Sequence, residues 1–238
     1  MDSRQTFVFC RPWNWRYLLR PHHFCRIFVN GVLVSDIKNG ETLSFTLPVL
    51  PLYLIGIAES REEDFPCTHV CIRPASDDSP IHISIRPDSE IPWHTLWKAV
   101  PDDKKYTLPS PMLERINRLY ILPETDDASV SDTERTVLLC NEFLIDTVDG
   151  LLEVLRNARF YEILNALDAV GDTVWSARLR ASLKACPHTA IPMTDEEYSK
   201  PLESEALGKT EEEWRVLLSS DLRTLYRQII EYLLARLQ

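Results

Sequence analysis

Two short runs of cysteine and histidine hold the residues of this chain that are best suited to chemistry. The first begins at Cys67 and ends at Cys71, with His69 between them. Because side chains alternate between the two faces of an extended strand, both thiols and the imidazole would share one face. A structural zinc ion binds four such ligands, and buried free cysteines more often pack as small apolar residues, so we predict no metal here. The candidates for a fourth ligand lie in another predicted strand: His22, His23 and Cys25.

The second run places Cys186 and His188 on either side of Pro187. A nucleophilic thiol needs a base, and the base needs a third group to orient it, which is not evident here. The sequence also has no Gly-rich phosphate loop, no Gly-x-Ser-x-Gly elbow and no His-Glu-x-x-His zinc helix. We therefore predict no cofactor, no catalytic residues and no enzymatic activity. A zinc- or thiol-dependent enzyme is the alternative hypothesis.

A stripe of acidic residues is the strongest pattern for binding. Its members are four, three and four residues apart: Glu142, Asp146, Asp149 and Glu153. On one continuous helix they would share a face, and carboxylates about every 5 Å resemble a ladder of phosphates that attracts a basic groove. An ordinary solvated helix face has the same pattern, so both interpretations stay open. Asp149-Gly150 can also end the helix and split the stripe. The apolar residues expected on roughly the opposite face are Leu144, Ile145, Val148, Leu152 and Leu155.

The charge of the chain is unevenly distributed. The formal net charge is −10, with 13 acidic and 12 basic residues in 1–105 but 23 acidic and 14 basic residues in 106–238. A net negative charge disfavours binding to the phosphate backbone of nucleic acid, because like charges repel. The asymmetry indicates a basic protein partner for the second half.

The first half has the alternation and turn residues of a β-domain. Asn30-Gly31 predicts a hairpin, and Lys38-Asn39-Gly40 predicts a second turn. These turns, with Val29 and Glu41 beside them, are similar to repeats in small bacterial β-sandwich accessory domains. We predict an antiparallel β-sandwich over residues 1–105. The expected strands are Phe24–Val29, Val32–Ile37, Thr42–Leu47, Leu52–Ala58, His69–Arg73 and Ile81–Arg86.

Aromatic residues at two places in the first half need a role. Trp13, Trp15 and Tyr17 alternate, as in a platform that binds a sugar or peptide, or in the packed edge of a sandwich. Trp93 and Trp97 lie near the predicted domain boundary, where we expect them to cover a seam between domains.

The second half has helical periodicity. Ser131 and Glu134 form a capping box before an apolar run, and Gly171 and Asp172 end one helix and cap the next. The last helix keeps an apolar stripe from Leu222 to the C-terminus. We predict an α+β two-domain protein with an all-α domain over 131–238. Residues 106–130, rich in Pro and Asp, are predicted to be a linker with a short helix at 112–120.

Three stretches of the second half match the pattern of one helical family. They are Gly150 to Asn157, residues 166–171 leading into a helix that ends at Cys186-Pro187, and the closing helix preceded by residues 195–197. On these residues the chain resembles the bacterial DNA-mimic protein domain. Asp149 replaces the first of the paired glycines of that family, and Leu151 stands where an aromatic residue is usual.

The resemblance implies a non-enzymatic protein that docks an acidic surface onto a DNA-binding protein in place of DNA; similar domains also lie near toxin–immunity loci. We predict that the four carboxylates occlude the basic surface of a DNA-binding regulator or a nuclease toxin, in an immunity or regulatory role. A homodimer stays open, and carbohydrate or peptide binding by the sandwich is a further alternative.

The remaining features place the protein in the cytoplasm. The first residues lack a basic segment followed by an apolar one, and the six cysteines are too sparse for a disulfide scaffold. The longest apolar run, Leu50–Ala58, is broken by Pro51 and is shorter than the roughly 20 residues of a spanning helix. We therefore expect no membrane association.

Overall fold

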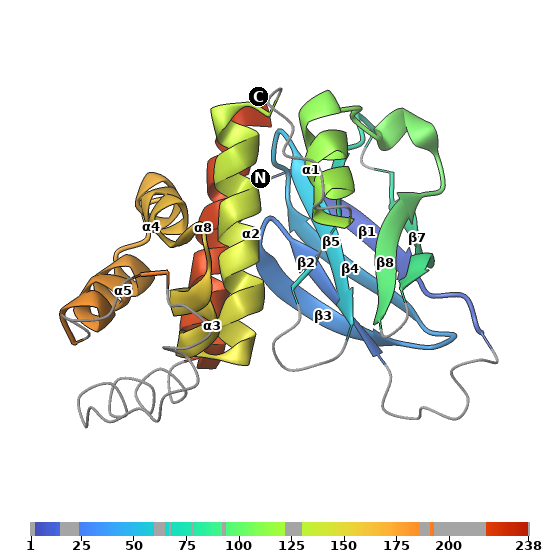
Figure 1. Cartoon of the computed structure of the whole chain (residues 1–238). Helices are drawn as coiled ribbons and strands as arrows, with labels where there is room; N and C mark the ends of the chain where they lie inside the picture. The colour runs from blue at the N-terminus through green and yellow to red at the C-terminus, as the bar shows by residue number, and fades with distance from the viewer. Residues whose placement is uncertain are drawn as a thin grey trace. The chain divides into compact units, whose positions relative to one another are not determined.

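The fold is mixed α+β. A computed structural model describes residues 3–14, 24–59, 65–66, 68–77, 79–91, 94–121, 130–185, 191–192 and 218–237. The chain divides into two compact units, Met1–Asp126 with Leu234–Gln238 and Asp127–Leu233. The first unit contains α1 (Pro111–Ile121) as well as the strands, so helices are not confined to the predicted helical domain of residues 131–238 (Figure 1). No helix in the described ranges has the length and apolar character needed to cross a membrane.

Two four-stranded sheets form the first unit. One has the order β4 (Thr42–Pro48), β1 (Arg4–Cys10), β7 (Ile81–Ile91), β8 (His94–Pro101), and the other has the order β3 (Val32–Lys38), β2 (Phe24–Val29), β5 (Tyr53–Glu59), β6 (His69–Ile72). β1 and β7 are parallel, so the prediction of a purely antiparallel arrangement is wrong at this pair. A parallel pair needs a long crossover. Between β1 and β7 the chain forms β4 of the same sheet and all four strands of the other sheet.

The core of this unit lies between the two sheets. Side chains alternate along the strands, so every second residue points inward, and Phe7 packs edge-on against Tyr53 with ring centroids 4.8 Å apart. Trp97 is only 4% exposed and belongs to this core, so the prediction that it covers a seam between domains is wrong. The guanidinium of Arg11 lies 4.6 Å from the centre of its ring. Trp93 is outside the described residues.

A predicted hairpin turn and helix α1 also belong to this unit. Asn30 and Gly31 have φ of 50° and 77°, which confirms the predicted two-residue hairpin. Asn117 of α1 accepts a hydrogen bond from the backbone N–H of His69 and donates one to its carbonyl, at 3.0 and 2.8 Å. These bonds fasten α1 to β6, so residues 106–121 are part of the first unit, although the sequence predicted a linker there.

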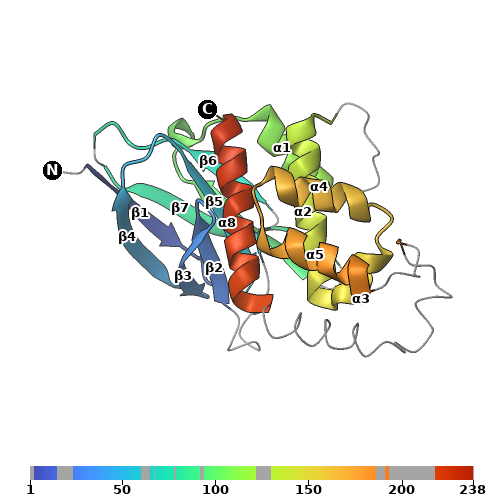
Figure 2. The ribbon, with the colours of Figure 1, turned by 90° about the vertical axis from the view of Figure 1, so that its left-hand side faces the viewer.

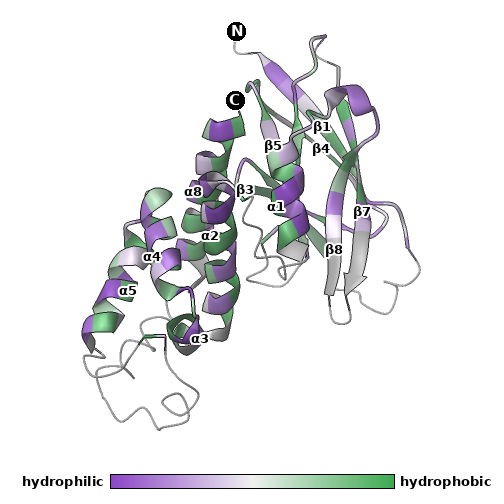
Figure 3. Ribbon diagram, turned by 45° about the horizontal axis from the view of Figure 1, so that its top comes forward, coloured by the Kyte–Doolittle hydropathy of each residue, from purple (hydrophilic) through white to green (hydrophobic). Residues whose placement is uncertain are grey.

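The second unit is helical. Its elements are α2 (Asp132–Asp149), α3 (Leu151–Arg156), α4 (Phe160–Ala169), α5 (Val174–Ala185) and most of α8 (Leu218–Leu237). α2 and α8 lie side by side, with α4 and α5 beside them (Figures 1 and 2). The helices alternate hydrophobic and hydrophilic residues along their length, as amphipathic helices do (Figure 3).

The predicted start of α2 and the predicted junction of α4 and α5 are confirmed. The capping box is formed, because Ser131 Oγ accepts from the Glu134 N–H and Glu134 Oε2 accepts from the Ser131 N–H. Gly171 has φ of 81° after α4, and Asp172 Oδ2 accepts from the Trp175 N–H at 2.7 Å at the start of α5. The predicted apolar stripe of α8 is buried at Leu222, Leu225, Tyr226, Ile229 and Leu233.

Candidate functional site

The four predicted carboxylates do not lie on one continuous helix. α2 ends at Asp149, Gly150 has φ of 116°, and α3 begins at Leu151. Such a φ favours glycine and breaks the helical path. Glu142 and Asp146 therefore lie on α2, whereas Glu153 lies on α3. Asp149 is the last residue of α2, and its side chain is outside the described part of the structure.

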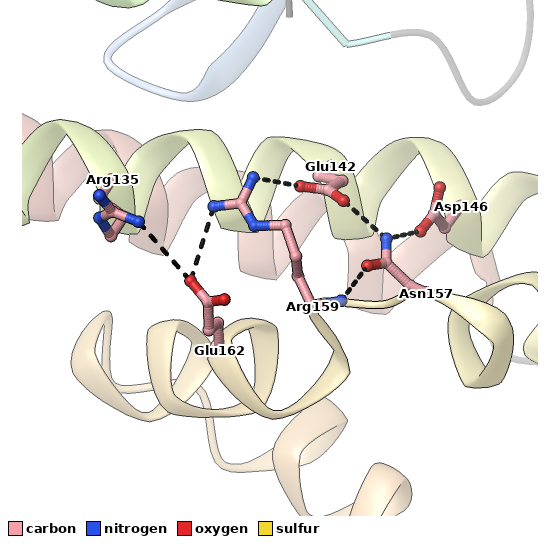
Figure 4. Close-up of polar contacts among 6 residues, drawn as sticks. All are labelled: Arg135, Glu142, Asp146, Asn157, Arg159 and Glu162. Atoms are coloured by element: carbon pink, nitrogen blue, oxygen red, sulfur yellow. Dashed lines mark hydrogen bonds and ion pairs between the residues drawn. The ribbon is translucent and has the colours of Figure 1, made fainter. Parts of the chain in front are cut away.

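Asn157 brings the two carboxylates of α2 together. Its Nδ2 donates to Glu142 Oε1 and to Asp146 Oδ2, both at 2.7 Å, and its Oδ1 accepts from the backbone N–H of Arg159 at 2.7 Å (Figure 4). A primary amide has two N–H donors, and here each serves one carboxylate. The segment between α3 and α4 is thereby fastened to α2.

Arg159 and Glu162 extend this arrangement along α2. Arg159 Nη1 lies 3.2 Å from Glu142 Oε2, and Glu162 Oε2 lies 3.8 Å from both Arg159 Nη2 and Arg135 Nη1 (Figure 4). We call this set the Asn157 network; it consists of Arg135, Glu142, Asp146, Asn157, Arg159 and Glu162. Glu153 is separate from it and pairs with Arg156 at 3.3 Å within α3.

Sequence reasoning found Glu142 and Asp146 of the network and missed the other members, Glu162 among them. Asn157 and Arg159 lie beyond the end of α3, so the periodicity of a single helix gives no signal for them. The one available signal was Asn157 as the last residue of the family-like stretch that starts at Gly150. The position of Asn157 depends on the direction that the chain takes at Gly150. No repeat in the sequence indicates that direction.

Two aliphatic residues of α2 are exposed, and they lie at different angles from these carboxylates. Ile145 is 50% exposed and Val148 44%, although both were predicted to lie opposite the acidic stripe. At 3.6 residues per turn, Ile145 is only about 60° around the helix from Glu142, so the prediction is wrong for Ile145. Val148 is about 120° from Glu142 and about 160° from Asp146, roughly on the opposite side as predicted. The others fare differently: Leu144 and Leu155 are buried, and the side chain of Leu152 is outside the described residues. We call Glu142, Ile145, Asp146 and Val148 the α2 surface.

Most of the excess negative charge lies elsewhere in the second half. The described residues 130–185 and 218–237 hold 11 Asp and Glu against 9 Lys and Arg. Residues 122–129 and 193–217, outside the described ranges, hold 11 against 3. The α2 surface therefore belongs to a helical unit whose described charges are nearly balanced.

The described thiol and imidazole candidates are poorly suited to nucleophilic catalysis or metal binding. Burial lowers the pKa of His69 to about 4 and raises that of Cys71. A buried thiol with a raised pKa is a poor nucleophile, because the thiolate is the reactive form. Within the described ranges, no three His, Cys, Asp or Glu side chains are grouped so that they could hold a metal ion. Cys67, Cys186 and His188 are outside these ranges.

Two other buried thiols are held in the protonated form. Burial raises the pKa of Cys25 to about 12, with Arg11 acting in the opposite direction. Burial also raises the pKa of Cys140, and the nearby Asp172 adds to this. Both side chains therefore act as small apolar groups of the two cores.

Comparison with known proteins gives no relative: the chain matches no protein-family model, no curated protein and no solved structure. The α2 surface is the place where predicted binding residues and exposed apolar residues adjoin.

Proposed function

We propose that this chain is a non-enzymatic interaction protein whose helical domain, residues 131–238, binds a basic protein partner through the α2 surface. The observation that carries the proposal is the pair Ile145 and Val148, exposed one turn apart on α2, with Ile145 about 60° around the helix from Glu142. Interfaces combine an apolar centre, which loses water on binding, with a charged rim that selects the partner. The α2 surface has both parts.

The Asn157 network supports this role because it orders the charged part before a partner arrives. Asn157 is neutral, so its hydrogen bond holds the carboxylate of Asp146 without cancelling its charge. Side chains that are already fixed lose less conformational entropy on binding. A partner that presents Lys or Arg beside an apolar side chain would complement the surface.

The resemblance to the DNA-mimic domain gives the finer form of the proposal. In it, the partner is a cytoplasmic DNA-binding regulator or a nuclease toxin, and binding occludes the surface that takes nucleic acid. Glu142 and Asp146 would stand in for phosphates, while Glu153 on α3 would contribute from a separate element. The sandwich of residues 1–105 would be a second domain.

The apolar half of the surface is tested by capture of partners from a lysate of the source organism with the full chain as bait. Ile145→Ser with Val148→Ser removes the apolar centre at little cost in stability, because both side chains are exposed. Val174→Ser on α5 is the matched control, since Val174 is 41% exposed in the same unit. We expect a basic protein that the wild type and the control retain and the double variant loses. Equal retention by all three would contradict the proposal.

The charged half needs variants that keep the hydrogen bonds of Asn157, although Glu142→Gln gives up the ion pair with Arg159. Glu142→Gln and Asp146→Asn retain an oxygen that accepts from Asn157 but remove both charges. Partner retention should fall in this variant, and retention by the wild type should fall between low and moderate salt because screening weakens charge pairs. Retention that responds to neither change would remove the basic partner from the proposal.

A further inference from the structure

The two sheets of the sandwich end in edge strands, which are β4 and β8 in one sheet and β3 and β6 in the other. An edge strand presents backbone N–H and C=O groups that can pair with a strand of another molecule. Proteins protect such edges with charged side chains, with bulges or with a segment that covers the edge. The four edges of this sandwich differ in that protection.

Three of the edges are protected. Asn117 of α1 covers β6, because its side chain bonds to both the N–H and the carbonyl of His69. β3 carries Asp36 and Lys38, and its register with β2 shifts between neighbouring residues. β8 carries Lys98, and its register with β7 shifts as well.

β4 is the open edge. Residues 42–48 contain no charged side chain, and all seven pair with β1 in one unshifted register. Within the described part of the chain, β1 is the one strand that pairs with β4 (Figure 2). Pro48 is the last residue of the strand, and its carbonyl already accepts from the Tyr53 hydroxyl at 2.7 Å. The part of the strand before Pro48 is therefore the part available for pairing.

Hydrogen bonds at the two ends of the β1–β4 pair show which backbone groups face outward. The Arg11 N–H donates to Glu41 O, and the Val49 N–H donates to Ser3 O, both at 3.0 Å. Hydrogen-bonded and non-hydrogen-bonded pairs alternate along an antiparallel ladder, so the odd-numbered residues of β4 bond to β1. The N–H and C=O groups that point to the open edge belong to the even-numbered residues Thr42, Ser44 and Thr46.

The sequence of β4 is complementary to itself. An antiparallel pair of β4 strands centred on Ser44 places Thr42 opposite Thr46, and Leu43 opposite Phe45, of the second copy. All three outward residues then form hydrogen-bonded pairs, each of which exchanges two backbone bonds. Hydroxyl side chains meet hydroxyl side chains on the exposed face, while the half-buried Leu43 and Phe45 meet on the inner face.

We propose that this chain forms a homodimer in which the β4 strands of two copies pair antiparallel about Ser44. The pairing joins two four-stranded sheets into one continuous sheet. The occupant of the edge is a second copy because β4 supplies its own complement in donors, acceptors and side chains, and has no charge to repel it. This contact belongs to the sandwich and is independent of the α2 surface.

Sedimentation velocity of the full chain, over a concentration series up to about 1 mM, tests the self-association. We expect a reversible shift from the 27.5 kDa monomer to twice that mass. Hydrogen exchange measured by NMR locates the contact, since the N–H groups of Thr42, Ser44 and Thr46 should exchange more slowly as the protein concentration rises. A chain that stays monomeric, or a dimer without this protection, would overturn the proposal.

Two double variants test the register by changing the same two exposed positions. Thr42→Lys with Thr46→Lys puts lysine opposite lysine twice, so dimerisation should weaken by about tenfold. Thr42→Lys with Thr46→Glu puts lysine opposite glutamate and should dimerise at least as well as the wild type. General charge repulsion would not weaken the first variant, because its added lysines make the net charge of −10 less negative. Equal dimerisation by the two variants would overturn the proposed pairing.

Ile145→Ser with Val148→Ser is the control for the other exposed surface. This variant should dimerise like the wild type, because α2 takes no part in the strand pairing. Loss of the dimer in this variant would place self-association on the α2 surface and overturn the proposal. Far-UV circular dichroism checks that each variant is folded.

Discussion

Hydrogen bonds have opposite effects at the acidic side of α2 and in the loop of residues 11–14 of the sandwich. At α2, Glu142 and Asp146 look free in the sequence, but Asn157 ties them into the fold of their own unit. In the sandwich, hydrogen bonds from Asn39 hold this loop, whose tryptophan, Trp13, stays exposed. Residue type alone would give the reverse result, with charges outside and an aromatic ring inside. What a surface offers to a partner is therefore decided by which groups are already bonded.

The largest expected effect comes from the two tryptophans of the first unit, which differ in burial. Trp97→Ala should lower the free energy of unfolding by about 3–5 kcal/mol, because it opens a cavity in the core and removes the ring that faces the Arg11 guanidinium. Trp13→Ala should change it by less than about 0.5 kcal/mol, because its ring is mostly exposed. Urea unfolding followed by circular dichroism measures both. Similar losses for the two variants would mean that Trp13 is part of the core.

A medium effect is expected within the acidic stripe. Asn157→Ala should cost about 1–2 kcal/mol, since it removes two donors from half-buried carboxylates. Glu153→Ala is the matched control: its pair with Arg156 lies near the surface and should be worth less than about 0.5 kcal/mol. Urea unfolding at one pH compares them. If the two costs are equal, the Asn157 network is an ordinary solvated set of charges.

Local signals in the sequence were enough for much of the fold. Asn30-Gly31 and the Ser131 capping box each act over a few residues, so the hairpin and the start of α2 were predicted correctly. β1 was not predicted, because its pairing is non-local. Buried Gln5 of β1, for example, donates to Ser79 O and accepts from the Ala75 N–H, about 70 residues away along the chain.

The candidate site was predictable only in part, for the same reason. Helical spacing correctly placed Glu142 and Asp146 together on α2. It could not place Asn157, because the position of that residue depends on the direction the chain takes at Gly150, where φ is 116°. Periodicity describes one helix at a time, whereas this network joins the side of one helix to the segment that follows another.

The smallest expected effect concerns Asp172, a carboxylate bonded to backbone N–H groups at the start of α5. Unlike Glu142, it is almost completely buried, and this burial raises its pKa above the ordinary 3.8, although the N–H groups of Ser176, Trp175 and Val174 oppose the shift. The folded state therefore favours the protonated acid. The stabilising contribution is complete below pH 3.8 and is lost as the pH rises through the raised pKa.

Asp172→Asn keeps an oxygen that can accept from the Trp175 N–H and removes the ionisation. The variant should gain stability relative to the wild type, by about 1 kcal/mol or less, as the pH rises from 3.8 through the raised pKa. Urea unfolding of both proteins across this range gives the difference, in which the titration of all other groups cancels. A difference that falls with pH would show that the N–H groups and Arg178 outweigh burial, and that the folded state holds Asp172 as a carboxylate. In that case the contrast is between hydrogen-bonded carboxylates in the helical unit and the neutral amide of Asn39 in the sandwich. Burial of an acid then contributes nothing to that contrast.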